Sequence, residues 1–393
     1  MKFKIEKKLP GTLARAGMIE TEHGVIETPA FVVVGTKATV KSVTPEQVKE
    51  LGAQVVLANT YHLYLQPGDE LIHTAGGLHN FMNWAGPTIT DSGGFQAFSL
   101  GAAYGQSVSK IGSAIQREET SDQIAESPLA KVDEDGVTFK SHLDGSEHRF
   151  TPERSIQIQH NIGADIIFAF DECTSPTASL EYQKQAMART HRWAERSLAE
   201  HQKLGGGQAL FGIVQGGQYQ DLREESARVI GGMDFAGFGI GGSFTEDDIG
   251  TAVAWVNKIL PEEKPRHLLG IGEPQDLFMG VEQGIDTFDC VIPTRMARHG
   301  QLFTNQGKIN ILNAQFRSDF TPPEAGCQCY TCAHYTKAYL AHLFRAKEMT
   351  AATLASIHNL YFLINLIKQI RQSVLDGSFA QLKEQFLLTY KKQ

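Results

Sequence analysis

Short apolar runs alternate with helical stretches along most of this chain, and that rhythm limits the possible folds more than any other feature. The apolar runs cover residues 31–35, 54–59, 88–91, 165–171, 210–215, 235–242, 267–272 and 287–293. Helical patterns such as 44–51, 155–162, 180–204 and 274–283 separate most of them. Continuous apolar strands between helices indicate a parallel sheet that is covered on both faces. Eight such units predict an α/β fold, a (β/α)8 TIM barrel, with an open doubly wound sheet as the alternative.

Polar residues stand at or near the C-terminal ends of these runs. They include Asn59, Asp91, Asp171, Gln215 and Asp289. In a barrel these ends form the catalytic face, so residues far apart in sequence would meet at one mouth. Any one of them could instead cap the following helix, but capping is a weak explanation for the whole set.

Two further segments depart from the alternation. Residues 1–28 alternate polar and apolar side chains, which predicts a small N-terminal antiparallel sheet at the barrel floor. Residues 101–135 are polar and rich in Ser and Gly, so they are interpreted as a long loop or insertion, which could be a lid or only a solvated excursion. A short hairpin is predicted after it, at 137–142 and 147–150.

The overall composition limits the function. Of the 393 residues 41% are hydrophobic, and a net charge of -8 argues against a general nucleic-acid coat. Between residues 289 and 371, nine Lys/Arg face four Asp/Glu, which fits either a local RNA-binding surface or an ordinary solvated face. No apolar run approaches about 18 residues and the N-terminus has no apolar signal region, so we expect a cytoplasmic protein without a membrane span.

Three of the five cysteines lie close together, as Cys327, Cys329 and Cys332. The odd number and the clustering disfavour disulfides and favour a zinc ion in a reducing compartment. A histidine would complete a tetrahedral shell, and His334, His342 and His358 all remain possible on spacing alone. Four protein ligands leave no open position, so we expect the zinc to be structural rather than catalytic.

Asp91 and Asp289 form a possible catalytic pair at the predicted mouth. Two carboxylates suit cleavage of a glycosidic bond, because one can attack the anomeric carbon while the other handles the proton of the leaving group. Strand alternation points Asp289 away from the neighbouring Phe288 and Cys290, so it can face the mouth. A tight structural turn at Asp91-Ser92-Gly93-Gly94 is an equal alternative for the first member of the pair.

A third group fits recognition of a nucleobase. Asp171 could accept two hydrogen bonds from the N1–H and 2-amino groups of guanine. Gln215 could donate to O6, Gly241 and Gly242 could offer backbone N–H groups, and Phe95 could stack on the ring. Each of these residues also has a plain packing role as its alternative.

The segments ITDSGGFQ, FAFDEC, FGIVQGG, FDCVIPTRMARHG and CQCYTC with a later IHN occur here in one order. This order resembles the tRNA-guanine transglycosylase family, also called queuine tRNA-ribosyltransferases, in its bacterial type, over nearly the whole chain. The resemblance implies a single catalytic barrel over 1–393 with a zinc-binding subdomain at 305–370. It also implies site roles: Asp289 as nucleophile, Asp91 as general acid/base, Asp171, Gln215, Gly242, Phe95 and Leu269 around the base, Arg295 and Arg298 on tRNA, and Cys327, Cys329, Cys332 and His358 on zinc.

The implied reaction replaces guanine at the wobble position of tRNAs with GUN anticodons by a 7-deazaguanine, through a covalent Asp-ribose intermediate, in queuosine synthesis. A homodimer is implied as well. The precursor preQ1 is the expected incoming base, and the alternatives are a queuine-accepting salvage enzyme or a non-catalytic tRNA-binding subunit. The chain departs from the family after Gly242, where the acid that reads the aminomethyl group of the incoming base could be Glu246 or Asp247 or could be absent. It departs again at Leu269, where a Met is common. The loop after Ser99 is also longer than usual.

Overall fold

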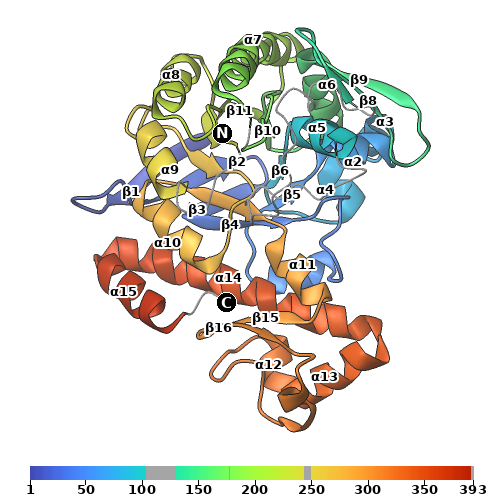
Figure 1. Ribbon diagram of the computed structural model, residues 1–393, viewed down its shortest axis with the longest axis vertical. Coiled ribbons are helices and arrows are strands. Elements are labelled where there is room, and N and C mark those ends of the chain that lie inside the picture. The colour runs from blue at the N-terminus through green and yellow to red at the C-terminus, as the bar shows by residue number, and fades with distance from the viewer. Residues whose placement is uncertain (103–129, 177, 243–248, 391–393) are drawn as a thin grey trace.

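The computed structural model describes residues 1–102, 130–176, 178–242 and 249–390, and its centre is a closed barrel of parallel strands (Figure 1). Hydrogen bonds join the strands in chain order, and β14 pairs with β4 to close the ring. The barrel strands are β4 (Ala30–Val34), β5 (Val56–Ala58), β6 (Thr88–Thr90), β10 (Ile166–Phe168), β11 (Ala209–Val214), β12 (Gly237–Ile240), β13 (Arg266–Leu268) and β14 (Thr287–Cys290). Each predicted run overlaps one of them, so the predicted (β/α)8 barrel is confirmed and the open sheet is excluded.

Several predicted runs extend past the strands that they overlap. β10 ends at Phe168 and β13 at Leu268, whereas their runs were predicted to continue to residues 171 and 272. The chain leaves the ladder at these points to form the loops of the barrel mouth. Gly242 and Gly270 lie in such loops with φ of +116° and +73°, a backbone conformation that favours glycine. The apolar pattern therefore locates each strand but overestimates its C-terminal end.

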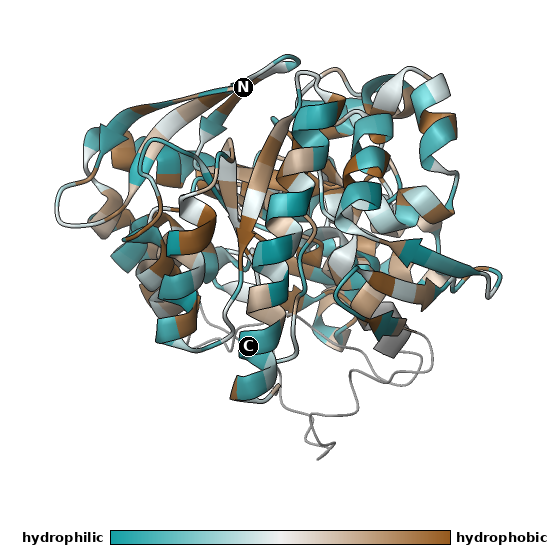
Figure 2. Ribbon diagram, turned by 90° about the horizontal axis from the view of Figure 1, so that it is seen from above, coloured by the Kyte–Doolittle hydropathy of each residue, from teal (hydrophilic) through white to brown (hydrophobic). Residues whose placement is uncertain are grey.

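Helices surround the barrel, and Figure 2 shows them banded with hydrophobic and hydrophilic residues. The helix predicted at 44–51 is present and begins with a capping box, in which the Thr44 side chain and Gln47 satisfy each other's backbone N–H groups. The covering helices are α1 (Pro45–Glu50), α2 (Thr60–Leu65), α3 (Asp69–Thr74), α4 (Gly77–Met82), α5 (Gly94–Ala102), α6 (Pro152–Ile162), α7 (Leu180–Leu204), α8 (Gln220–Gly231), α9 (Ile249–Asn257) and α10 (Pro274–Glu282).

The predicted N-terminal sheet is also present, as β1 (Lys2–Lys8), β2 (Arg15–Thr21) and β3 (Gly24–Thr28). Ile19 and Ile26 of this sheet belong to the same hydrophobic cluster as Val32, Ile89 and Ile166 from the barrel strands. Alternate strand residues such as Phe31 and Val33 pack instead in the larger cluster with the surrounding helices. The sheet therefore covers the N-terminal end of the barrel, as the sequence predicts.

The interpretation of 101–135 as a loop needs correction at both ends. Residues 101 and 102 complete helix α5, and residues 130–132 form strand β7 (Ala130–Val132). β7 adds to the predicted hairpin, which is β8 (Val137–Lys140) and β9 (Glu147–Phe150), and makes it a three-stranded sheet. Residues 103–129 lie outside the described part of the chain. β7 was missed because its three residues show too short an alternation to be recognised.

The C-terminal part lies against one side of the barrel (Figure 1). It consists of α11 (Ile292–Arg298), β15 (Gln301–Thr304), β16 (Gly307–Asn310), a 3-10 helix (Ala314–Ser318), α12 (Tyr330–His334), α13 (Lys337–Ala346), α14 (Met349–Asp376) and α15 (Phe379–Thr389). Leu302, Ile311, Leu340 and Leu354 share a small core of their own. The bounds 305–370 for an independent subdomain stay a prediction.

Helix α14 connects this part to the barrel. Its beginning packs in the small C-terminal core, and residues from Ile357 onward pack with the barrel and its helices. Among the described residues it is the one helix long and apolar enough to cross a membrane, but 72% of that apolar window is buried inside the structure. Packing on two cores accounts for its apolar composition.

A buried ion pair fixes the N-terminal sheet to the barrel. Arg15 on β2 donates from Nε and Nη2 to the two carboxylate oxygens of Asp286, at 2.9 and 2.6 Å. The side chains are only 2% and 0% exposed. Asp286 precedes β14 and also accepts from the Arg266 backbone N–H at 2.7 Å. Bidentate geometry satisfies both charges, which burial would otherwise make costly.

Breaking this pair should therefore destabilise the fold strongly. We expect Asp286→Asn to lower the free energy of unfolding by about 3–5 kcal/mol, because it leaves the Arg15 charge buried without its partner. The matched control is Glu224→Gln on the exposed face of α8, where loss of the Arg228 pair should cost less than about 1 kcal/mol. Urea denaturation measures both variants, and equal losses would contradict the assignment.

Candidate active site

A pocket opens at the C-terminal ends of the barrel strands. The residues predicted for this region that line it are Asp91, Phe95, Asp171, Gln215, Gly242 and Leu269. They follow β6, β10, β11, β12 and β13, so the barrel brings residues from five strand ends to one place. Asp289 is not part of this lining but lies next to it, because it accepts a hydrogen bond from Gly270, which directly follows Leu269.

Asp171 is buried three residues after the end of β10. The Ser92 hydroxyl donates to its Oδ1 at 2.9 Å, and the Gln215 amide nitrogen donates to its Oδ2 at 2.7 Å. Ionised carboxylates accept such bonds at both oxygens. The Asp171 carboxylate therefore lies in the pocket wall with both oxygens oriented by hydrogen bonds, and Gln215 lies beside it as predicted.

Asp91 is held by the start of helix α2. The backbone N–H of Thr60 donates to its Oδ1 at 2.9 Å, and the side-chain amide of Asn59 donates to its Oδ2. Asn59 also caps α2 by accepting from the His62 N–H at 2.9 Å. Asn59 therefore has both roles that its position suggested: it caps a helix and it contacts the site.

Asp289 lies on β14 with Phe288 and Cys290 as its neighbours, and both neighbours pack in the outer cluster. Alternation thus turns Asp289 inward, as predicted. Its Oδ1 accepts from the Gly270 N–H at 2.7 Å and lies 3.1 Å from Nε2 of His267. His267 is fully buried, and its Nδ1 lies 2.8 Å from the Thr287 hydroxyl. His267 on β13 and Gly270 in the loop after that strand therefore fix the rotamer of this carboxylate.

Backbone forms the wall near Gly241 and Gly242. A Cβ on Gly241 would lie 2.8 Å from Nε2 of Gln215, so a side chain there would displace the glutamine. The buried Arg223 on α8 donates to the carbonyls of Gly217 and Gly241, each at 2.7 Å, and burial lowers the pKa of its guanidinium to about 10. Arg223 thus connects the loops after β11 and β12. The expected acids Glu246 and Asp247 lie outside the described residues.

Arg295 and Arg298 are exposed on α11, the short helix that follows β14. Burial, followed by repulsion from Arg295, lowers the pKa of Arg298. Asn359 on α14 positions this helix, since its side-chain amide donates to the carbonyls of Pro293 and Gln301 at 3.0 and 2.9 Å. Two cations therefore stand together beside the strand that carries Asp289.

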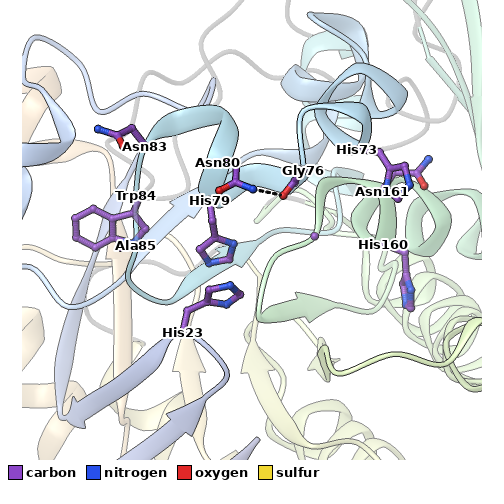
Figure 3. Close-up of a pocket in the computed structure, with 12 residues that line it drawn as sticks. His23, His73, Gly76, His79, Asn80, Asn83, Trp84, Ala85, His160 and Asn161 are labelled. Carbon is purple, nitrogen blue, oxygen red and sulfur yellow. Dashed lines mark hydrogen bonds between the residues drawn. The ribbon is translucent and has the colours of Figure 1, made fainter.

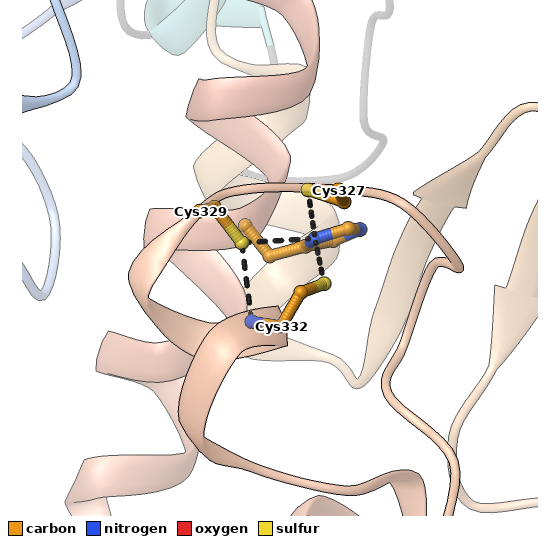
Figure 4. Close-up of side chains that lie close together, drawn as sticks. Cys327, Cys329 and Cys332 are labelled. Atoms are coloured by element: carbon orange, nitrogen blue, oxygen red, sulfur yellow. Dashed lines mark hydrogen bonds between the residues drawn. The ribbon is translucent and has the colours of Figure 1, made fainter.

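Cys327, Cys329, Cys332 and His358 form one cluster in which the possible ligand atoms all lie within 4.8 Å of one another (Figure 4). Nδ1 of His358 is 3.9, 3.5 and 3.3 Å from the sulfurs of Cys327, Cys329 and Cys332, in that order. Its Nε2 lies 2.7 Å from the Phe303 carbonyl, which can only accept, so Nε2 carries the ring proton. The lone pair of Nδ1 then faces the sulfurs, as a metal ligand requires. The set could bind one metal ion.

This geometry decides the question that spacing left open. His358 reaches the cysteines from the buried face of α14. His334 and His342 do not belong to the cluster among the residues that the structure describes. His358 is therefore the fourth member, as the family resemblance implies.

The family model described as Queuine tRNA-ribosyltransferase matches residues 11–392. Curated proteins of that name from Caldanaerobacter subterraneus subsp. tengcongensis and Thermoanaerobacter pseudethanolicus are each 48% identical over 99% of this chain and 98% of their own length. One from Streptococcus pneumoniae strain CGSP14 is 47% identical over 99% of this chain and 96% of its own. The chain belongs to the queuine tRNA-ribosyltransferase family.

Two buried residues at the site of this family member were missed in the sequence. His267 alternates with Leu268 and opens a predicted strand, so its inward position could have been inferred. Arg223 lies on the same face of α8 as Ser226, Ala227 and Ile230, all of which are buried. An arginine on an apolar helical stripe is the signal that could have indicated a buried structural role.

The cluster predicts a metal content that variants can test. We expect about one ion per purified chain by elemental analysis, and loss of that ion with reduced thermal stability in His358→Ala, because a site that binds only the folded state stabilises it. His334→Ala and His342→Ala are matched controls that should keep the ion. If His358→Ala retained the ion and either control lost it, the assignment of His358 as the fourth ligand would be wrong.

Proposed function

We propose that this protein is a tRNA-guanine transglycosylase, a pentosyltransferase that exchanges guanine at the wobble position of GUN-anticodon tRNAs for preQ1 in queuosine synthesis. The observation that supports this best is the convergence of Asp91, Asp171 and Gln215 in one pocket, with Asp289 beside it. Family membership over nearly the whole chain supports the same activity.

The first half of the reaction would form a covalent intermediate. A carboxylate oxygen of Asp289 attacks ribose C1′, the bond from C1′ to N9 of guanine breaks, and Asp91 gives a proton to the departing base. The bonds from His267 and Gly270 hold Asp289 in one rotamer before substrate arrives. Fixing this rotamer before substrate binds favours the reaction, because the side chain of Asp289 then loses no rotational freedom on the way to the transition state.

The second half would reverse these steps with the new base. Asp91 removes the N9 proton of the incoming 7-deazaguanine, N9 attacks C1′, and the ester bond to Asp289 breaks. Two inversions give retention at C1′. No nucleotide hydrolysis is needed, since one N-glycosidic bond replaces another. The strand stays intact because only the base is exchanged.

Base recognition would use the groups that surround Asp171. A guanine-like edge presents two adjacent donors, N1–H and the 2-amino group, and a carboxylate presents two acceptors. Gln215 would turn its amide toward O6, Gly242 would supply a backbone N–H, and Phe95 and Leu269 would cover the ring faces. Arg295 and Arg298 would contact the tRNA backbone near the target, where phosphates attract exposed cations.

We infer that the ion in the cysteine cluster is structural zinc, since three thiolates and one imidazole suit its tetrahedral shell and leave no position for substrate. We also propose a cytoplasmic homodimer as the working assembly. A non-catalytic tRNA-binding subunit is the alternative. The presence of both carboxylates, each hydrogen-bonded in place, argues for the enzyme.

Removing the nucleophile provides the main test. Asp289→Asn should reduce exchange of labelled guanine into tRNA by about 10^4-fold or more and abolish the protein-tRNA adduct on a denaturing gel. Asp234→Asn is the matched control, because this exposed residue precedes β12 at the opposite end of the barrel. Wild-type exchange by Asp289→Asn would disprove the assignment.

The incoming base can be identified by competition. Unmodified tRNA is offered guanine, preQ1 and queuine in turn, and we expect guanine and preQ1 to be used. Asp171→Asn should raise KM for the base by about 10- to 100-fold, because its amide NH2 would face base donors. Efficient use of queuine would favour a salvage enzyme, and tRNA binding without any exchange would favour the non-catalytic subunit.

A further inference from the structure

A second cluster of metal-binding residue types lies at the other end of the barrel. His23 is in the turn between β2 and β3, His79 is on α4, and Asp165 directly precedes β10. Asp171 follows the same strand, so β10 separates this cluster from the candidate active site. The pockets at the two ends share no lining residue among the described parts of the chain.

The cluster has a compact geometry. Nδ1 of His23 lies 2.8 Å from Oδ1 of Asp165, and Nε2 of His79 lies 3.1 Å from Oδ2. The two imidazole rings stack with their centroids 3.5 Å apart and their planes inclined by 15°. Like the cysteine cluster, these ligand atoms all lie within 4.8 Å of one another. Three chain segments therefore place their ligand atoms around one point.

Asp165 is a largely buried residue whose two carboxylate oxygens both have hydrogen-bond partners. It is 8% exposed, and its Oδ2 also accepts from the Thr88 N–H at 2.8 Å. A negative charge in a largely buried place needs a positive or strongly donating partner.

A cavity of about 680 Å³ adjoins the cluster, and Figure 3 shows His23 and His79 on one side of it. His73, His160 and Asn161 line another part. Gly76, Gly77 and Gly163 lie in its wall with positive φ, so backbone as well as side chains borders the space. Water or a small ligand in this cavity can therefore reach His23 and His79.

We propose that His23, His79 and Asp165 form a second metal site, which takes a divalent transition ion such as Zn²⁺, Co²⁺ or Ni²⁺. Two imidazole nitrogens and one carboxylate oxygen suit these ions better than Mg²⁺ or Ca²⁺, which prefer oxygen ligands alone. On binding, each ring moves its proton to the nitrogen that faces away from Asp165, and the ion takes the place of the two hydrogen bonds. Water from the adjoining cavity would complete the coordination of the ion.

The ion would fasten the N-terminal sheet to the barrel. His23 belongs to that sheet, whereas His79 and Asp165 belong to the barrel and its helices. A ligand that binds only the folded arrangement stabilises it in proportion to its saturation. The site lies on the opposite face from the candidate active site, so its role is independent of the proposed exchange reaction.

The test uses the full chain after weakly bound ions are removed on a chelating resin, with elemental analysis verifying that one zinc ion, that of the cysteine cluster, remains per chain. Isothermal titration with Co²⁺ should reveal one additional ion per chain, and this ion should lack the intense near-ultraviolet thiolate-to-cobalt bands that a cysteine site gives. Ni²⁺ should raise the thermal midpoint of the same protein. Binding of no further ion, or cobalt spectra with thiolate bands alone, would overturn the proposal.

Variants separate this site from incidental binding by surface histidines. His23→Gln and His79→Gln should weaken binding of the additional Co²⁺ by about 100-fold or more and remove the Ni²⁺-induced thermal shift, because loss of a ligand costs at least as much as loss of an outer contact. His73→Gln, an exposed residue of the same cavity, is the matched control and should bind normally. Far-ultraviolet circular dichroism checks folding. Equal affinity in all three variants would overturn the assignment.

Discussion

Closure of eight parallel strands is the constraint on which the rest of this structure depends. A closed parallel barrel sends alternate side chains inward and brings all C-terminal strand ends to one rim. Asp91, Asp171, Gln215 and Asp289 derive from strands distributed around the ring, yet they meet because each follows or ends a strand. The chemistry of the site is thus a consequence of topology first and of local sequence second.

Each carboxylate of the site is held by neighbours from another strand end. Asp91 is hydrogen-bonded to Asn59 and Thr60, Asp171 to Ser92 and Gln215, and Asp289 to Gly270 and His267. These donors reduce the cost of placing several negative groups in a confined space. They also fix directions, so substrate meets acceptors already arranged for it. The same hydrogen bonds therefore both orient the three carboxylates and stabilise their negative charges.

Much of this arrangement could be predicted from the sequence, because strand positions and strand-end polar residues depend on local patterns. The strand ends themselves were overestimated, since apolar residues continue into the loops. Spacing did not decide which histidine joins the cysteine cluster, because His358 lies on a helix, 26 residues after Cys332. Arg223, strand β7 and the cluster of His23 with His79 and Asp165 went unrecognised. Arg223 left a local signal on its helix and β7 was too short to recognise, whereas the cluster of His23, His79 and Asp165 depends on contacts between segments distant in sequence, for which a single chain gives no local signal.

Two adjacent residues of α14 contact different parts of the structure. His358 points toward the cysteines. Asn359 donates hydrogen bonds to the carbonyls of Pro293 and Gln301, and it accepts one from the Phe303 N–H at 3.0 Å. A carboxamide alone offers donors and an acceptor on one short side chain. Because His358 and Asn359 are adjacent on α14, the cysteine cluster is linked through this helix to α11 and β15. A displacement of the cysteine cluster would therefore shift α11 and the exposed Arg295 and Arg298 on it, although no residue of the cluster lines the pocket at the barrel mouth.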